Sequence, residues 1–151
     1  KAFKRAEGLL EIWMKQHHDK DCYPPTIINI TDGEYNGVSD AEMQQLANQL
    51  KSMFTNDGNV LLFNIHIVPG HIESVVFPAS IGELNRNGYG EKLYNMSSLL
   101  PLNYNEQIRA IFGDKQPDIR YHAMGVNAGM ERLVKMMKIG TLSSMFVNNN
   151  L

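Results

Sequence analysis

The sequence predicts an α/β fold in which helices flank a partial doubly wound (Rossmann-like), mainly parallel sheet. Three observations predict this fold. Thr26–Thr31 is a short β-branched run that ends in Asp32 and Gly33. Val60–Ile67 is a nearly continuous apolar run, which is typical of a strand buried on both faces. A segment with helical periodicity lies between the two runs, and a strand, a helix and a second strand in this order form a right-handed parallel βαβ unit.

The elements up to the second strand follow from periodicity and from turn residues. Residues 3–17 carry apolar side chains at helical spacing, which predicts an amphipathic helix. Pro24 and Pro25 cannot continue a helix, so they favour an extended entry into the first strand. Ser39 with Glu42 three residues later is a capping box, and the apolar face that follows it predicts a second helix.

Shorter elements are predicted beyond the second strand. A brief strand over residues 74–77 ends at Pro78, which suits a sheet edge, where a missing backbone donor does no harm. The remaining predictions are a loop over residues 82–90, a helix over 89–100, a short helix from Asn103 to Phe112, a strand or extended arm over 119–126, and a last helix that Asn127 caps and Gly140 ends.

Composition limits the classes of function. The chain has 151 residues, which is the length of about one domain, and 43% of them are hydrophobic, which is enough to bury a core. The net charge of -2 and the absence of a basic cluster exclude nucleic acid as an expected partner. Apolar runs are too short to span a membrane, so we expect no membrane partner. The single cysteine, Cys22, is typical of a reducing compartment and favours a cytoplasmic protein.

The end of the first strand is the candidate site. In open α/β sheets, ligands bind beyond the carboxyl ends of the strands, and Asp32 presents a carboxylate there, with Gly33 and Glu34 at the rim. Gly33 suits a turn with positive φ or a close approach of another backbone. An alternative is that Asp32 only caps a turn.

Other patterns of catalytic or metal-binding residues are weaker. No pair among the five histidines has metal-ligand spacing, and His66 is interpreted as a hydrogen-bonded structural residue. The sequence has no nucleophile elbow, phosphate-binding loop or dinucleotide-binding motif. The nine methionines fall mostly on predicted apolar faces, where they fill the core.

Residues 2–78 resemble the second half of a von Willebrand factor A domain. The resemblance is carried by the helix with Trp13, by Tyr23–Glu34 and by Asn59–Ile67, and it is strongest to bacterial, intracellular-type members, which Phe77–Ser80 and Leu93–Pro101 also resemble. It implies a doubly wound sheet with a divalent cation, usually magnesium, at the carboxyl ends of its strands, in a metal-ion-dependent adhesion site that a partner's carboxylate commonly completes. It divides the chain into residues 1–102, the von Willebrand factor A-like half, and 103–151, a helical extension packed on the same domain.

The chain also departs from the family pattern. The family takes most cation ligands from an Asp-x-Ser-x-Ser motif and from a later threonine, which would both precede Lys1, so only Asp32 corresponds to a metal ligand. Magnesium prefers about six oxygen ligands, so we expect it to bind only if another segment supplies the missing ones. We also expect the strand before Asp32 to be an open edge, which a complementing chain or a second copy would cover.

The resemblance implies a protein-binding module with an incomplete adhesion site, in which Gly33 and Glu34 border the ligand. One alternative is a structural fragment with a degenerate site. A second is an Asp-dependent phosphoryl-transfer enzyme, as in haloacid-dehalogenase-like phosphatases, which need a paired acid. Because Ile30 stands two positions before Asp32, where a second acid would be expected, the protein is not predicted to be an enzyme.

Overall fold

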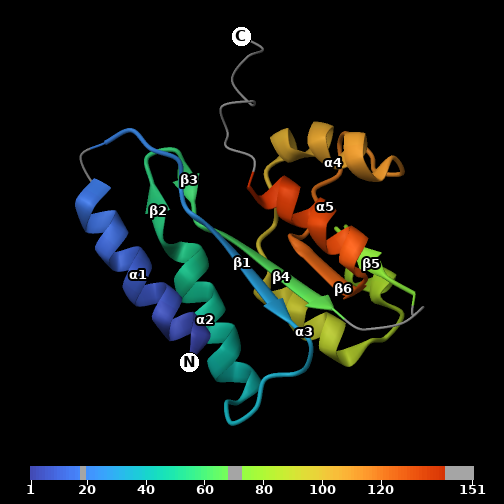
Figure 1. The fold of residues 1–151 in the computed structure, drawn as a ribbon, viewed down its shortest axis with the longest axis horizontal. Coiled ribbons are helices and arrows are strands. Elements are labelled where there is room, and N and C mark those ends of the chain that lie inside the picture. The colour runs from blue at the N-terminus through green and yellow to red at the C-terminus, as the bar shows by residue number, and fades with distance from the viewer. Residues whose placement is uncertain (18–19, 68–72, 142–151) are drawn as a thin grey trace.

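The structure is a computed structural model, and it describes residues 1–17, 20–67 and 73–141 (Figure 1). Its main sheet has four strands in the order β1-β4-β6-β5, with the bounds β1 (Thr26–Thr31), β4 (Leu61–Ile67), β6 (Met124–Ala128) and β5 (Val75–Val76). Strands β1, β4 and β6 run parallel, and β5 runs antiparallel to β6. A separate hairpin joins β2 (Phe54–Thr55) to β3 (Gly58–Asn59). The predicted α/β class and the mainly parallel sheet are confirmed.

Helices cover both faces of this sheet. Their bounds are α1 (Ala2–His17), α2 (Asp40–Ser52), α3 (Gly88–Met96), α4 (Asn105–Phe112) and α5 (Met130–Gly140), with short 3-10 helices η1 (Ile81–Leu84) and η2 (Leu102–Tyr104). Among the described residues, no helix has the length and apolar character needed to cross a membrane.

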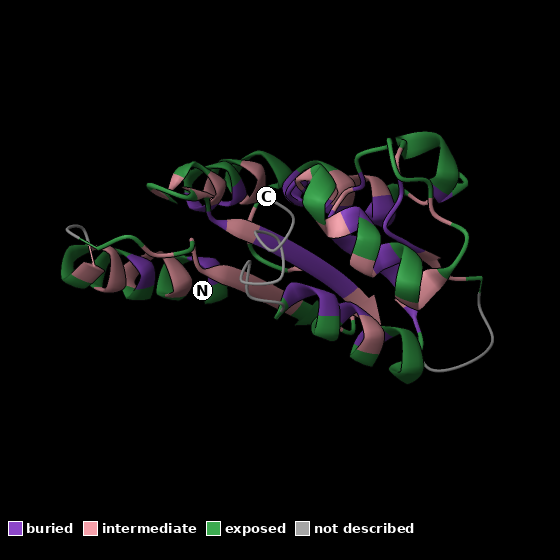
Figure 2. Cartoon of the chain, turned by 90° about the horizontal axis from the view of Figure 1, so that it is seen from above, coloured by how far each residue is buried: buried purple, intermediate pink, exposed green. Residues whose placement is uncertain are grey.

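Two hydrophobic cores, one on each face, hold the layers together. Leu62 of β4 packs with Ala47 of α2 and Leu93 of α3. The next side chain, Phe63, points to the other face and packs with Met136 of α5. This alternation explains why β4 is apolar almost throughout, since it is buried on both sides. Figure 2 shows the result, with buried residues in the middle and exposed ones on the outer sides of the helices.

The predicted capping box of α2 is confirmed. The Ser39 hydroxyl accepts a hydrogen bond from the Glu42 backbone N–H at 3.2 Å, and the Glu42 carboxylate accepts one from the Ser39 N–H at 3.0 Å. Two backbone donors at the helix start are thereby satisfied. This fixes where the segment after β1 turns into α2.

The predictions beyond Pro78 were less accurate. Residues 82–90 are not a loop, because η1 occupies its first part and α3 already begins at Gly88, where Asn87 caps it. Helix α3 ends at Met96 instead of residue 100. Asn127 does not cap α5: it is a residue of β6 with a φ of 54°, and Gly129 is the N-cap.

The proposed boundary after residue 102 stays a prediction. Strand β6, which follows that boundary in the sequence, lies between β4 and β5 inside the sheet. Gly140 is the last residue of α5 and lies against Ile28 of β1, since a Cβ at this glycine would come within 3.1 Å of the Ile28 Cδ1. Helix α5 therefore reaches across the sheet from β6 to β1.

Candidate functional site

The carboxyl ends of β1 and β4 lie side by side and bring the candidate residues to one edge of the sheet. Thr31 at the end of β1 is in register with His66 near the end of β4. Asp32 follows β1 directly and begins the segment between β1 and α2, residues 32–38, which we call the rim loop. Because ligands of open α/β sheets bind beyond this edge, the rim loop is the candidate site.

The first turn of the rim loop is closed by Thr31 and not by Asp32. The Thr31 hydroxyl accepts a hydrogen bond from the Gly33 N–H at 3.2 Å and donates one to the Gly33 carbonyl. Asp32 is exposed, and its carboxylate forms no hydrogen bond or ion pair with the residues that the structure describes. Its oxygens are therefore available to a ligand.

Gly33 does not need the conformational freedom that the sequence suggested. Its φ lies outside the left-handed region, and a Cβ added to it would meet nothing within 4 Å. The residue that uses this freedom is Gly37, four positions later, with a φ of 74°. Gly33 contributes its backbone carbonyl instead.

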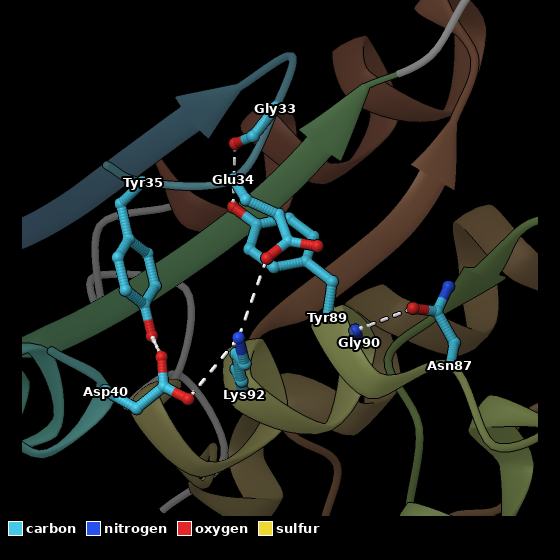
Figure 3. A network of polar contacts seen from close by, with 8 residues as sticks. All are labelled: Gly33, Glu34, Tyr35, Asp40, Asn87, Tyr89, Gly90 and Lys92. Atoms are coloured by element: carbon cyan, nitrogen blue, oxygen red, sulfur yellow. Dashed lines mark hydrogen bonds and ion pairs between the residues drawn. The ribbon is translucent and has the colours of Figure 1, made fainter. Parts of the chain in front are cut away.

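Helix α3 holds the rim loop from the side, as Figure 3 shows. The Tyr89 hydroxyl donates a hydrogen bond to the Gly33 carbonyl at 2.9 Å. The Lys92 ammonium lies between two carboxylates, 3.5 Å from Glu34 and 3.3 Å from Asp40. Exposed ion pairs contribute little to stability, so the buried end of this network, Tyr89, is the stronger restraint.

Charge and burial shift the pKa values of the network. Burial, and then the hydrogen bond that its hydroxyl donates to Asp40, raise the pKa of Tyr35 well above its ordinary value. The same hydrogen bond, followed by Lys92, lowers the pKa of Asp40. The hydrogen bond to Asp40 also raises the pKa of Lys92. At neutral pH the loop is therefore tied down by a neutral phenol, a carboxylate and an ammonium group.

His66 lies on β4 beside Thr31, the residue that precedes the rim loop. Its ring meets the Tyr89 ring edge to face, with 5.0 Å between the centroids. Burial lowers the pKa of His66, while the carboxylates of Asp32 and Glu34 act in the opposite direction. A side-chain hydrogen bond with Asn127, which acts to raise the pKa of His66, supports the expected hydrogen-bonded role. The Nδ1 atom, however, is buried and has no hydrogen-bond partner among the described residues.

The described residues do not form a metal site. In the described parts of the chain, no three histidine, cysteine, aspartate or glutamate side chains come together as a metal site would need. Asp32 and Glu34 alone offer too few oxygens for magnesium, which prefers about six ligands. Histidine 71 lies outside the described residues.

A groove adjoins the rim loop on the α2 and α3 face of the sheet. Its volume is about 1140 Å³, and it is bounded by α1, β1, the rim loop, α2 and α3. Apolar side chains that line it include Phe3, Met43, Leu46 and Leu93. Asn29 and Thr31 of β1 add polar groups. The groove is larger than most small-molecule sites, which favours a ligand the size of a peptide segment.

A buried polar relay leads into this groove. The Asn29 amide donates to the Asn64 carbonyl oxygen at 2.9 Å, and the Asn64 amide donates to the Ser97 hydroxyl at 3.0 Å. Ser97 in turn donates to the Leu93 carbonyl at 2.6 Å. Asn64 is fully buried, so each bond satisfies a group that would be costly to leave unpaired. The relay fixes Asn29 at the wall of the groove.

Tyr89→Phe is expected to loosen the rim loop. Loss of the hydroxyl removes the hydrogen bond to the Gly33 carbonyl, which is worth about 1 kcal/mol. Amide exchange of Gly33, measured by NMR, is therefore expected to become about fivefold faster. Tyr23→Phe is the control, because Tyr23 is 37% exposed and lies before β1. If amide exchange of Gly33 is unchanged in Tyr89→Phe, the Tyr89 hydroxyl does not restrain the rim loop.

Comparison of the chain with protein-family models, with characterised proteins and with solved structures gave no match. The resemblance to von Willebrand factor A domains therefore still rests on the sequence residues quoted above.

Proposed function

We propose that the protein is a protein-binding module of von Willebrand factor A-like fold that holds its partner with the rim loop. One observation carries the proposal. Tyr89 and Thr31 fix the backbone of Gly33, while the carboxylates of Asp32 and Glu34 on either side of it remain exposed. A loop that is already ordered loses little conformational entropy when a partner binds.

The surroundings of the rim loop indicate the chemistry of the partner segment. Glu34 shares the Lys92 ammonium with Asp40, whereas Asp32 has no ion-pair partner among the described residues, so the rim keeps negative charge. This charge favours a segment with a basic side chain, because opposite charges steer encounter and fix register. The groove beside the loop has an apolar lining that suits one or two apolar side chains of the same segment. A short peptide with a basic residue near an apolar one meets both requirements.

A metal is not needed for this proposal. In the family that the sequence resembles, a cation joins the module to its partner, but the described residues of this chain offer no complete ligand set. Magnesium would be held at Asp32 only if another segment supplied further oxygen ligands. Recognition through the rim loop uses its carboxylates and its ordered backbone.

The alternative is a structural fragment whose site has degenerated, and binding experiments separate the two. The immobilised protein is incubated with cell lysate, and bound proteins are quantified for wild type, for Asp32→Asn with Glu34→Gln, and for Asp118→Asn. Asp118 is exposed on the segment that leads into β6, away from the rim loop, so its variant is the charge-matched control.

At least one protein is expected to bind equally to wild type and to the Asp118 variant. The recovered amount of this protein is expected to fall about tenfold or more with the variant that combines Asp32→Asn and Glu34→Gln. This loss corresponds to about 1.4 kcal/mol of binding free energy. Equal recovery with all three proteins would favour the structural alternative.

A further inference from the structure

We propose that a pocket between β5, α4 and α5 binds a free α-amino acid with an apolar side chain. The pocket lies at the end of the sheet away from β1 (Figure 1), and no residue of the rim loop lines it. The proposal therefore does not rest on the function proposed above, and either of the two can fail without the other.

The pocket has the size of a small-molecule site. Its volume is about 510 Å³, and ligand pockets usually measure about 300–1,000 Å³. Strand β5, η1, the C-terminal end of α4 and the first half of α5 supply the residues that line it. A single amino acid fits this volume, whereas a folded partner would need a much larger surface.

The segment that follows α4 is fixed against the sheet at this pocket. Gly113 ends α4 with a φ of 75°, a conformation that suits glycine. Two residues later, the Lys115 ammonium donates a hydrogen bond to the carbonyl of Phe77, just after β5, at 3.1 Å. The same ammonium lies 5.1 Å from the centre of the Tyr121 ring. This wall is therefore ordered without a ligand, which lowers the entropy cost of binding.

Ser74 contributes an unused hydroxyl to the lining. Its Oγ atom is buried and has no hydrogen-bond partner among the described residues. Most buried side-chain polar atoms in folded proteins do have a partner, so this hydroxyl is suited to a polar group of a ligand.

The C-terminal end of α4 gives the pocket an apolar wall. Ile111 and Phe112 are both half-buried and line it. The Phe112 ring is held by an edge-to-face contact with the Phe77 ring, with 5.4 Å between the centroids. An apolar side chain of the ligand would lose its contact with water here.

The charged side chains of the lining balance one another. Three are basic and three are acidic, namely Lys115, Arg132 and Lys135 with Glu83, Asp114 and Glu131. A pocket that is neutral overall does not favour a multiply charged anion such as phosphate. It favours a ligand that carries one charge of each sign, because each charge then meets its opposite.

Some of these charges are already occupied within the fold. The Lys135 ammonium pairs with the Glu131 carboxylate at 2.7 Å. The Glu83 carboxylate accepts hydrogen bonds from the backbone N–H groups of Ala79 and Ser80, at 2.8 and 3.0 Å. With Lys115 bound to the Phe77 carbonyl, four of the six charged side chains have partners in the protein.

Arg132 and Asp114 are the two that remain. Both are exposed, and neither side chain forms a hydrogen bond or an ion pair with the described residues. Lys135 and, to a smaller extent, Arg132 lower the pKa of Glu131, but no ion pair joins Arg132 to that carboxylate. A guanidinium group can hold a carboxylate through two parallel hydrogen bonds, and a carboxylate can hold an ammonium group.

Together these groups match the parts of a free amino acid. Arg132 takes the α-carboxylate, Asp114 takes the α-ammonium group, and the side chain lies against Ile111 and Phe112. The Ser74 hydroxyl adds a hydrogen bond to one of the polar groups. A residue within a peptide chain has neither of the two charges, so the pocket selects the free amino acid.

Titration of the ¹⁵N-labelled protein with L-phenylalanine and with L-leucine, up to about 10 mM, tests the proposal by NMR. At least one of them is expected to shift the amide signals of Ser74, Lys115 and Arg132 in a saturable manner. For L-phenylalanine, 3-phenylpropionate lacks the ammonium group and 2-phenylethylamine lacks the carboxylate. Each analogue is expected to bind about tenfold or more weakly than the amino acid.

Four variants locate the two charges. Arg132→Gln and Asp114→Asn are each expected to weaken binding of the amino acid about tenfold or more. Arg109→Gln and Asp118→Asn are the matched controls, because both residues are exposed and neither lines the pocket. Both controls are expected to bind as wild type does.

Ser74→Ala separates binding from folding. It is expected to weaken binding about fivefold, while the Tm does not fall, because the hydroxyl has no partner to lose in the protein itself. A lower Tm with unchanged affinity would overturn the place of Ser74 in the site. The proposal as a whole is overturned if neither amino acid gives saturable shifts, if the analogues that lack one charge bind equally well, or if the control variants lose as much affinity as Arg132→Gln and Asp114→Asn.

Discussion

Asn105→Asp is expected to destabilise the protein by about 3 kcal/mol or more at pH 7. Asn105 is 2% exposed, and its amide nitrogen lies 2.7 Å from the carbonyl oxygens of Pro117 and Ile119 and 3.3 Å from that of Gln116. The substitution puts a carboxylate oxygen where the donor was, facing three acceptors. Urea unfolding measures the loss.

The loss is expected to shrink in acid. Burial and the facing carbonyls raise the pKa of the new carboxyl group above its unfolded value, and the protonated form can donate one hydrogen bond. Stability is therefore recovered as the pH falls below that raised pKa and is lost again as the pH rises through it. Asn103→Asp is the control, since Asn103 is exposed nearby and should change stability by less than about 0.5 kcal/mol. A deficit of equal size at pH 4.5 and pH 7 would contradict this account.

Phe63→Ala is expected to cost about 3–5 kcal/mol. The ring is fully buried in the central strand and meets Phe77 edge to face, with 6.3 Å between centroids. Ile28 and Gly140 also pack around it, so the neighbouring helix cannot collapse into the cavity without moving off β1. Thermal and urea unfolding should agree on the size of the loss.

Phe54→Ala is the matched control for Phe63. Phe54 lies in β2 and is 70% exposed, so its removal leaves no cavity, and a change below about 0.5 kcal/mol is expected. If both substitutions cost the same, Phe63 is not at the centre of a packed core.

Local patterns in the sequence were enough to predict the first half of the fold. The β-branched run that forms β1, the Ser39 capping box and the apolar run that forms β4 each act over a few residues, and all three are confirmed. Most of the wrong predictions lie after Pro78, where tertiary contacts determine which residues form helices and strands. Asparagine is a residue type that often caps helices, but Asn127 is a residue of β6 and has a positive φ.

The candidate site could be predicted only in part. The rule for strand ends places Asp32 at the rim, and the structure agrees with that position. The groups that fix the loop could not be found in the same way, because Tyr89 lies 56 residues from the Gly33 carbonyl that it binds. Asn64 did give a signal, since a polar residue inside an apolar strand needs a buried partner.

Contact between the rim loop and a protein partner can be captured by photo-cross-linking. A photo-reactive benzophenone side chain is placed at Glu34 in one protein and at Asp118 in another, both exposed positions. After irradiation in cell lysate, the Glu34 derivative is expected to give a discrete cross-linked protein band that the Asp118 derivative lacks. No band at Glu34, or the same bands from both positions, would contradict the claim.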